Sequence, residues 1–177
     1  RRLAEGGAYT LAGETVRPSI TPSALTSLLT GVPPRIHGVE SERIARHRPN
    51  GPIVTLPEFL RRHDVPVRAF RGRLPPLTAG VAKRITERLG IEATFTGHSA
   101  DEILDAALPT LHRRDRAVSF LHWLDADRAG HAHGWGSTAY HRAARQLDAA
   151  IGRLVETLDV MNDPATLLIA LADHGGG

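Results

Sequence analysis

Residues 117–124 read Ala117-Val118-Ser119-Phe120-Leu121-His122-Trp123-Leu124, an apolar run with the length of one β-strand. Such a run is typical of a strand that is buried on both faces of a parallel sheet. A second apolar run, Thr166 to Ala172, has the same character. Between the two runs, the segment from Thr138 to Leu158 has the spacing of an amphipathic helix, with one apolar face made of Leu147, Ala150, Ile151, Leu154 and Leu158. Strand, helix and strand in this order predict an α/β fold.

The alternation of helix and strand extends towards the N-terminus. We expect helices over 1–6, 22–31, 55–62, 79–89 and 99–111, and extended segments over 65–70 and 90–95. Residues 32–39 and 46–52 are expected to be loops. The predicted architecture is one domain over residues 1–177, with a mostly parallel sheet and helices on both of its faces. In such folds the ligand site lies beyond the carboxyl ends of the strands.

Composition limits the classes of function. The chain has 177 residues, of which 41% are hydrophobic and 23% charged, which suits the core of one ordinary domain. No window approaches the roughly 18 uninterrupted apolar residues of a membrane-spanning helix, so we expect no span in this segment. The absence of cysteine excludes a cysteine nucleophile and a thiolate zinc site, and it leaves the compartment open.

The basic character of the chain does not predict a nucleic-acid module. The sequence pI is 10.1 because nearly every basic residue is an arginine. These arginines are scattered along the chain, and aromatic residues make up only 5% of it. Surfaces that bind nucleic acids usually have basic residues clustered on one element, with aromatic residues among them. We therefore expect no nucleic-acid polymer as a partner.

Metal-ligating residue types follow both apolar runs. Asp173 and His174 come directly after the second run, and Asp127 and His131 follow the first run at a spacing of four. A carboxylate and an imidazole at a strand end form half of a divalent-cation site. For each motif alone, an ordinary polar turn is the alternative, and Asp125 and His133 are competing donors. Two such sets behind two buried strands favour a two-metal site of the kind that serves phosphoryl transfer.

Thr21 is a candidate nucleophile. Pro22 suits the first turn of the helix that ends at Gly31, which puts Thr21 at or beside the N-cap. A hydroxyl there lies among free backbone amides, which stabilise an alkoxide and a bound phosphate or sulfate. The alternative is an ordinary capping threonine. Rival hydroxyls belong to Ser19, Ser23 and Thr26, but Thr21 ranks first because only it directly precedes Pro22.

The motifs, in their order along the chain, resemble the type I phosphodiesterase/nucleotide pyrophosphatase family of the alkaline phosphatase superfamily. The resemblance rests on Thr21-Pro22-Ser23-Ala24-Leu25-Thr26-Ser27-Leu28-Leu29-Thr30-Gly31, Pro33-Pro34-Arg35-Ile36-His37-Gly38-Val39, Asp127-x-x-x-His131 and Asp173-His174-Gly175. It implies an alkaline-phosphatase-like fold and a metal-dependent hydrolase of phosphodiester or pyrophosphate substrates. The family uses two divalent metal ions, commonly zinc, and a covalent phospho-threonine.

Carried over by position, the resemblance implies a role for each candidate residue. Thr21 is the nucleophile, and Asp173 and His174 are ligands of the metal that activates it. Asp127 and His131 are ligands of the other metal. His37 matches a position that we take to be structural. The implied partner is a small phosphate-ester substrate, and the oligomeric state is left open.

The departures from the family pattern are also informative. The family's first metal-ligand Asp would precede Arg1, and its last ligand His would follow Gly177. We therefore expect an internal segment of a longer domain, incomplete at both ends, that binds metal weakly and is a poor catalyst by itself. Glu42 stands where the family has a substrate-binding Asn, so either Ser41 takes that role or the substrate group differs.

Other functions stay open as alternatives. A phosphomonoesterase or a sulfatase-like enzyme would share the superfamily fold. A sulfatase ranks lower, because sulfatases need a modifiable Cys or Ser as the nucleophile with an Arg nearby, and Thr21-Pro22-Ser23-Ala24 has a threonine at that position and no Arg. A catalytically silent binding or scaffold domain is the alternative from a different class.

Overall fold

The structure is a computed structural model that describes residues 2–41, 51–74, 76, 79, 80, 83, 86, 87, 89–91, 93–113 and 115–176. In this part of the chain, β1 (Val67–Gly72), β2 (Ala93–Gly97) and β3 (Val118–His122) form one sheet in the order β2-β1-β3. Both pairings are parallel, and Phe70 at the centre of β1 is in register with Phe95 on β2 and Leu121 on β3. The predicted parallel α/β sheet is confirmed.

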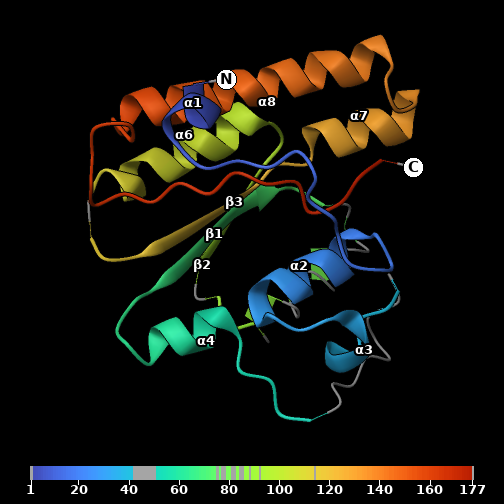
Figure 1. The fold of residues 1–177 in the computed structure, drawn as a ribbon, viewed down its shortest axis with the longest axis vertical. Coiled ribbons are helices and arrows are strands. Elements are labelled where there is room, and N and C mark those ends of the chain that lie inside the picture. The colour runs from blue at the N-terminus through green and yellow to red at the C-terminus, as the bar shows by residue number, and fades with distance from the viewer. Residues whose placement is uncertain are drawn as a thin grey trace.

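Helices lie on both sides of this sheet (Figure 1). They are α1 (Arg2–Gly6), α2 (Thr21–Thr30), α3 (Pro34–His37), α4 (Leu56–Arg61), α6 (Ala100–Leu111), α7 (Asp125–His133) and α8 (Thr138–Thr157). Helices α6, α7 and α8 lie on one side and α2, α3 and α4 on the other (Figure 1). This layered arrangement agrees with part of an alkaline-phosphatase-like fold. Among the described helices, none combines the length and the apolar character needed to cross a membrane.

The core forms where α6 packs between the sheet and α8. Ile103 and Leu104 of α6 are completely buried, and Ala150 and Leu154 of α8 pack against Leu104. The predicted apolar face of α8 is thus the face that is buried. Truncating a fully buried leucine such as Leu104 to alanine costs about 2–5 kcal/mol of stability in comparable cores. This core holds β3 and α7, the elements that carry part of the candidate site, in a defined place.

Local capping signals explain where several helices begin. The Ser99 hydroxyl accepts a hydrogen bond from the Glu102 amide at the start of α6, and the Thr55 hydroxyl accepts one from the Glu58 amide at the start of α4. Gly31 ends α2 with φ +69°, a left-handed conformation that glycine adopts without strain. These boundaries agree with the sequence predictions to within about two residues.

Thr21 is the first residue of α2 and Ile20 is its N-cap, so Thr21 lies beside the N-cap, which is one of the two placements that the sequence predicted. One prediction on the neighbouring segment is wrong. The segment after Gly31 is not entirely a loop, because residues 34–37 form α3. The polar segment after β3 turns helically and forms α7, which is the condition under which Asp127 and His131 were expected to point to one side. In α3 and α7 the chain keeps turning helically through residues whose composition is typical of loops, because each segment packs against a neighbouring helix.

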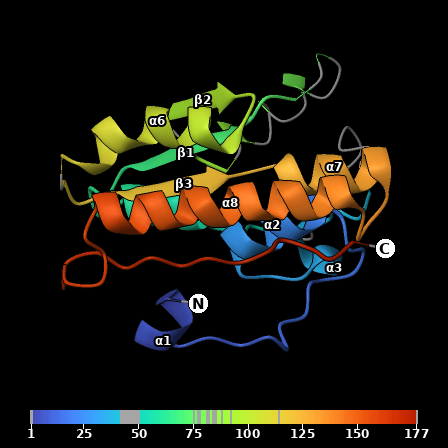
Figure 2. The ribbon, with the colours of Figure 1, turned by 90° about the horizontal axis from the view of Figure 1, so that it is seen from above.

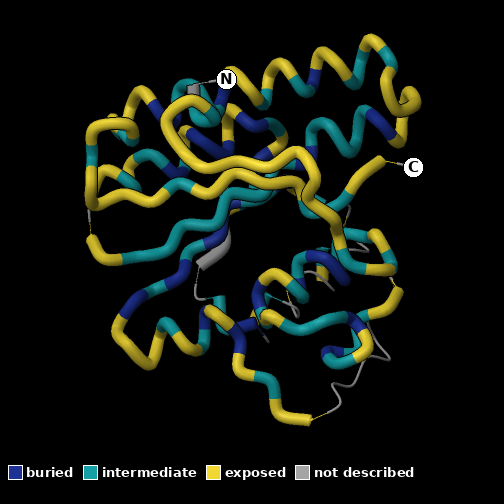
Figure 3. Tube along the Cα trace, in the orientation of Figure 1, coloured by how far each residue is buried: buried dark blue, intermediate teal, exposed yellow. Residues whose placement is uncertain are grey.

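The predicted strand over 166–172 is also absent. These residues have no regular secondary structure, and the side chains of Leu167 and Ile169 are 84% and 70% exposed. Figure 3 shows most of this segment as exposed, although Leu168 packs against the core between α6 and α8. An apolar run predicts burial, whereas a strand also needs a neighbouring backbone that pairs with it.

Some further predictions fall partly or wholly outside the described residues. In the segment 79–89, residues 79, 80, 83, 86 and 87 are helical and residue 89 lies in a turn, so the helix ends before the predicted residue; the other positions lie outside the described residues. Glu42 and residues 46–50 of the predicted loop also lie outside the described residues.

Candidate active site

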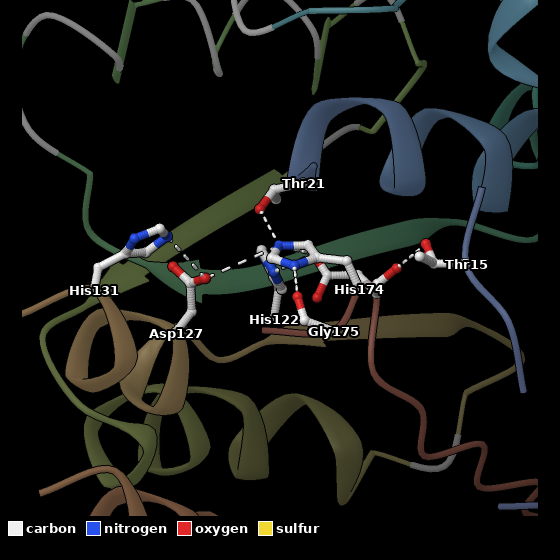
Figure 4. Close-up of polar contacts among 8 residues, drawn as sticks. Thr15, Thr21, His122, Asp127, His131, His174 and Gly175 are labelled. Carbon is white, nitrogen blue, oxygen red and sulfur yellow. Dashed lines mark hydrogen bonds and ion pairs between the residues drawn. The ribbon is translucent and has the colours of Figure 1, made fainter. Parts of the chain in front are cut away.

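Three stretches that are far apart in the sequence meet at one end of the sheet (Figure 4). β3 ends at His122, and α7 begins three residues later with Asp127 in its first turn. The segment that contains Asp173 and His174 passes beside them, and the first residue of α2, Thr21, faces His174. This end is the carboxyl end of the parallel strands, where α/β folds bind their ligands.

Thr21 and His174 are in direct contact. The Oγ1 atom of Thr21 lies 2.9 Å from Nε2 of His174. The side chain of His174 is only 12% exposed, which holds its ring in one orientation. The helix start that presents Thr21 has no side-chain cap, because its N-cap residue is Ile20. The amides of this first turn are therefore not used by a capping side chain.

The contact of the other ring nitrogen assigns the tautomer of His174. Nδ1 lies 2.9 Å from the carbonyl oxygen of Gly175, and a carbonyl oxygen only accepts hydrogen bonds. In the neutral imidazole Nδ1 therefore carries the hydrogen and Nε2 carries the lone pair. The Thr21 hydroxyl donates to that lone pair. A lone pair held in this way is also what a metal ligand needs, since ligating histidines commonly donate their second N–H to a carbonyl or carboxylate.

Two carboxylate oxygens face the same edge of the His174 ring. Oδ1 of Asp127 lies 4.0 Å from Nε2 of His174, and Oδ2 of Asp173 lies 3.7 Å from it. Both oxygens are buried, and neither receives a hydrogen bond from the described residues. Buried carboxylate oxygens that accept no hydrogen bond are destabilising, so a cation at this place would stabilise them.

Two histidines determine the charge state of Asp173. Burial raises the pKa of its carboxyl, whereas the neighbouring rings of His122 and His174 lower it. The lowering effects prevail, so the pKa lies below its ordinary value and Asp173 is ionised at neutral pH. Nε2 of His122 is 3.7 Å from Asp173 Oδ2, which is longer than a hydrogen bond and leaves an electrostatic interaction.

His131 occupies the outer edge of the site. Its Nε2 lies 3.5 Å from Oδ1 of Asp127, and its side chain is 72% exposed. Asp127 thus lies between His131 and His174 (Figure 4). Asp127 and His131 are four residues apart on the regular helix α7. Their carboxylate and imidazole groups therefore lie on one side of the helix, as predicted.

The donor set suits zinc in its chemistry, since it combines carboxylate oxygens with imidazole nitrogens. A cation would be stabilised beside the Nε2 lone pair of His174, where one oxygen each of Asp127 and Asp173 accepts no hydrogen bond. Within the described part of the chain, however, no three acidic or histidine side chains converge as a ready-made metal site. The structure therefore assembles the predicted residues in one place and leaves their role as metal ligands a prediction.

The rival hydroxyls have other functions in the structure. Ser23 is completely buried and its hydroxyl donates to the Val39 carbonyl at 2.6 Å. The Thr26 hydroxyl donates to the Pro22 carbonyl at 2.7 Å, and Ser19 is exposed. Among the competing donors, Asp125 accepts a hydrogen bond from the Ala100 amide at 3.2 Å. Of the candidates that the sequence offered, Thr21 is the hydroxyl that contacts His174.

His37 has the structural role expected of it. It is buried, and its Nδ1 accepts a hydrogen bond from the Val39 amide at 3.0 Å. Nε2 therefore carries the hydrogen in the neutral ring and donates to the Ser27 hydroxyl at 2.8 Å. These bonds connect α3 to α2, the helix that presents Thr21.

Sequence reasoning missed His122 and Thr15. His122 is the last residue of β3 and contacts Asp173, and the signal for it was a polar residue inside the otherwise apolar run 117–124. The Thr15 hydroxyl donates to the Asp173 carbonyl at 2.6 Å and so positions the segment that carries His174. Thr15 lies in a polar stretch that has no distinguishing pattern.

Comparison with known proteins gives a family for this arrangement. The sequence model of the type I phosphodiesterase / nucleotide pyrophosphatase family matches residues 69–177, which is more than half of the chain. The match includes Asp127, His131, Asp173 and His174, whereas Thr21 lies outside it.

Individual relatives carry names from phosphoester chemistry. The chain is 33% identical over 86 residues to GPI ethanolamine phosphate transferase 1 of Aspergillus oryzae, a match that covers 48% of this chain and 8% of the relative. It is 37% identical over 79 residues to the catalytic subunit of GPI ethanolamine phosphate transferase 3 of Mus musculus, covering 44% of this chain and 7% of the relative. The chain spans less than a tenth of the length of these relatives. By the family match over residues 69–177, this chain belongs to the type I phosphodiesterase/nucleotide pyrophosphatase family.

Proposed function

We propose that this chain is part of a phosphoryl-transfer enzyme that acts on phosphodiester substrates through a covalent phospho-threonine at Thr21. The observation that carries the proposal is the 2.9 Å contact between Thr21 Oγ1 and His174 Nε2. In this contact, the lone pair of His174 Nε2 points at the Thr21 hydroxyl. A nucleophile held by a neighbouring base or ligand is the arrangement that covalent catalysis needs.

The chain's own residues would divide the first chemical step between them. Thr21 Oγ1 forms the bond to phosphorus, the bond from phosphorus to the leaving alkoxide breaks, and the proton of the Thr21 hydroxyl ends on the leaving alcohol by way of solvent. His174 Nε2 accepts the hydrogen bond of the hydroxyl when no cation is bound and would coordinate the cation when one is, because it has a single lone pair. The uncapped first turn of α2 stabilises a phosphate oxygen by its backbone amides. Asp127 with His131, and Asp173 with His174, would hold the two divalent cations. When bound, these supply the positive charge that neutralises the phosphate and favours an alkoxide.

The second step decides between a hydrolase and a transferase. Water as the acceptor releases the phosphoryl group from Thr21 as a phosphate monoester, whereas an alcohol as the acceptor yields a new phosphodiester. The named relatives are ethanolamine phosphate transferases, which favours an alcohol acceptor and an ethanolamine phosphate donor. The family description favours hydrolysis. Both outcomes share the phospho-threonine, so the proposal is centred on that intermediate.

The test is capture of the intermediate in the full-length protein. The enzyme with added zinc is mixed with bis(4-nitrophenyl) phosphate, quenched in acid and digested, and the peptide that contains Thr21 is examined by mass spectrometry. We expect a nitrophenyl phosphate adduct on Thr21 and none in Thr21→Ala. Ser19→Ala, which changes an exposed rival hydroxyl, serves as the matched control and should retain the adduct. An adduct elsewhere, or turnover without one, overturns the proposal.

The acceptor is identified in the same system. Adding glycerol to the reaction should divert product from nitrophenyl phosphate to its glycerol diester if the enzyme is a transferase. An unchanged product indicates a hydrolase.

A catalytically silent binding domain is the second candidate. The observation that favours it is that no ready-made group of three metal donors occurs among the described residues. Retention of zinc without turnover of any phosphodiester would support it.

A further inference from the structure

Trp135 occupies a turn built to place a large side chain. It lies between Gly134 and Gly136, in the connection from α7 to α8, and these glycines have φ values of +88° and +76°. Both values lie in the left-handed region of φ, where residues other than glycine are strained. Nothing lies within 4 Å of the place where a Cβ would be at either glycine, so backbone conformation alone requires them. The turn folds the Trp135 indole back onto α7.

The indole lies directly against two further glycines that come from different segments. A Cβ at Gly130 of α7, or at Gly176 near the C-terminus, would overlap the ring of Trp135. Figures 1 and 2 both show the C-terminal end beside the connection between α7 and α8. The ring therefore fills the space between α7 and the segment that follows His174, and it fits only because both positions lack a side chain.

These glycines are adjacent to the candidate site residues. Gly130 lies directly before His131 and three residues after Asp127, and Gly176 lies two residues after His174. The ring of His131 packs edge-on against Trp135 with centroids 5.5 Å apart, and Tyr140 packs on it at 5.6 Å. The indole is thus fixed by neighbours from α7, α8 and the C-terminal segment.

We propose that Trp135 is a positioning residue that clamps α7 against the segment 173–176 and thereby sets the approach of Asp127 to His174. The inference deepens the proposed function and rests on it for the meaning of the site, whereas the clamp itself rests on the contacts of the indole. Removing the ring leaves the two glycine segments without their common support, so the 4.0 Å separation of Asp127 Oδ1 and His174 Nε2 is no longer maintained. Trp135 itself touches no reacting atom in this scheme.

The expected effect is on cation affinity and on the chemical step. Trp135→Ala should weaken zinc binding by about 10- to 100-fold, as loss of a residue that orients ligands commonly does. With an aryl phosphodiester, kcat should fall by a similar factor while KM changes little, because the substrate is not contacted. Trp135→Phe retains a ring against both glycines and should retain most of the zinc affinity and most of kcat. A merely structural role would lower the melting temperature without this recovery pattern.

A double-mutant cycle tests the clamp independently of activity. Gly176→Ala and Gly130→Ala, each made in the full-length protein, should displace the indole. We expect the emission of Trp135, taken as the difference between each protein and its Trp135→Ala counterpart, to shift towards the red. In the Trp135→Ala background the same glycine changes should have no further effect on zinc affinity, which is measured by competition with a chromogenic chelator. Gly152→Ala on α8, where a Cβ meets nothing within 4 Å, is the matched control and should behave like wild type.

The outcomes separate the clamp from the proposed function. Additive effects in the cycle, or unchanged emission and zinc affinity in both glycine variants, overturn the clamp even if the enzyme turns over phosphodiesters. A coupled cycle in a protein that turns over no phosphodiester supports the clamp and overturns the proposed function instead.

Discussion

The hydroxyl of Thr21 and Nε2 of His174 are 2.9 Å apart in space and 153 residues apart in the sequence. One residue begins helix α2, and the other follows a segment without regular structure. Nothing local brings them together. The contact depends on the packing of α2 against α3 and on the support of the C-terminal segment by Thr15 and His122. Because this contact depends on the packing of distant segments and not on local sequence, the pair is a candidate for function.

Replacing the Thr21 hydroxyl should remove turnover without unfolding the protein. Thr21→Ala is expected to lower kcat for an aryl phosphodiester by several powers of ten, because loss of a covalent nucleophile removes most of the barrier lowering. Thr21→Ser keeps the hydroxyl and should retain measurable activity. Turnover is followed by release of nitrophenolate, and the melting temperature checks the fold. If Thr21→Ala keeps near-normal turnover, another hydroxyl is the nucleophile.

Neutralising the carboxylates of Asp127 and Asp173 should abolish the response to zinc. In Asp127→Asn, a buried oxygen that accepts no hydrogen bond loses its charge, so the melting temperature of the metal-free protein should stay the same or rise. In Asp173→Asn it should fall slightly, because the lowered pKa of Asp173 means that the fold stabilises the ionised carboxyl. The rise that zinc causes in wild type should disappear, and that rise corresponds to about 2.7 kcal/mol when zinc is at 100 times its Kd. Thermal unfolding with zinc or with a chelator measures both quantities.

Asp148→Asn, on the exposed face of α8, is the control for this experiment and should respond to zinc as wild type does. An undiminished zinc response in Asp173→Asn would show that the cation is held by other residues.

The elements that the sequence predicts well are those with local signals. The starts of α4 and α6 follow from Thr55 and Ser99, whose hydroxyls accept hydrogen bonds from amides three residues later. The buried face of α8 follows from the helical spacing of its apolar residues. The spacing of Asp127 and His131 likewise depends only on helical geometry. Each of these signals acts over a few residues and is not altered by the rest of the fold.

The features that the sequence did not predict depend on contacts between distant segments. Residues 166–172 have the apolar character of a strand but lack its pairing, which is a property of the neighbouring backbone. His122 matters because Asp173 lies 3.7 Å away, and Trp135 matters because Gly130 and Gly176 leave room for its ring. None of these neighbours is visible in a local pattern. The same is true of the contact between Thr21 and His174. The helix start and the apolar run made these residues candidates, and the family resemblance gave each a role, but no local pattern predicts their contact.

Removing the buried imidazole of His37 should destabilise the region that presents Thr21. His37→Ala leaves the Val39 amide and the Ser27 hydroxyl without their partner, and an unsatisfied buried polar group costs about 1–3 kcal/mol. The free energy of unfolding, measured with urea, should fall by that order. His112→Ala, just after α6, is the control and should cause little change. A His37 variant with unchanged stability but altered zinc affinity would contradict the structural role.

The ion pair between Arg68 and Asp115 should make stability depend on pH in the acid range. Arg68 of β1 contacts both carboxylate oxygens of Asp115, at 2.6 and 3.3 Å, and so connects β1 to the segment before β3. Hydrogen bonding to Arg68 holds the pKa of Asp115 below its ordinary value. A lowered pKa means that the folded protein binds the proton less readily than the unfolded chain does. The stabilisation is therefore present above the unfolded pKa of about 3.9 and is lost as the pH falls through the lower folded pKa.

Asp115→Asn should consequently melt at a slightly lower temperature than wild type at pH 7, and the difference should shrink below about pH 4. Because the carboxylate is exposed, about 1 M salt should also reduce the difference by screening the charges. The measurement is thermal unfolding of both proteins between pH 7 and pH 2.5, with Asp148→Asn as a control that removes an exposed carboxylate from α8. A difference in melting temperature that stays constant across this pH range would mean that the effect of the substitution is steric. The charge of Asp115 would then not stabilise the contact between β1 and the segment before β3.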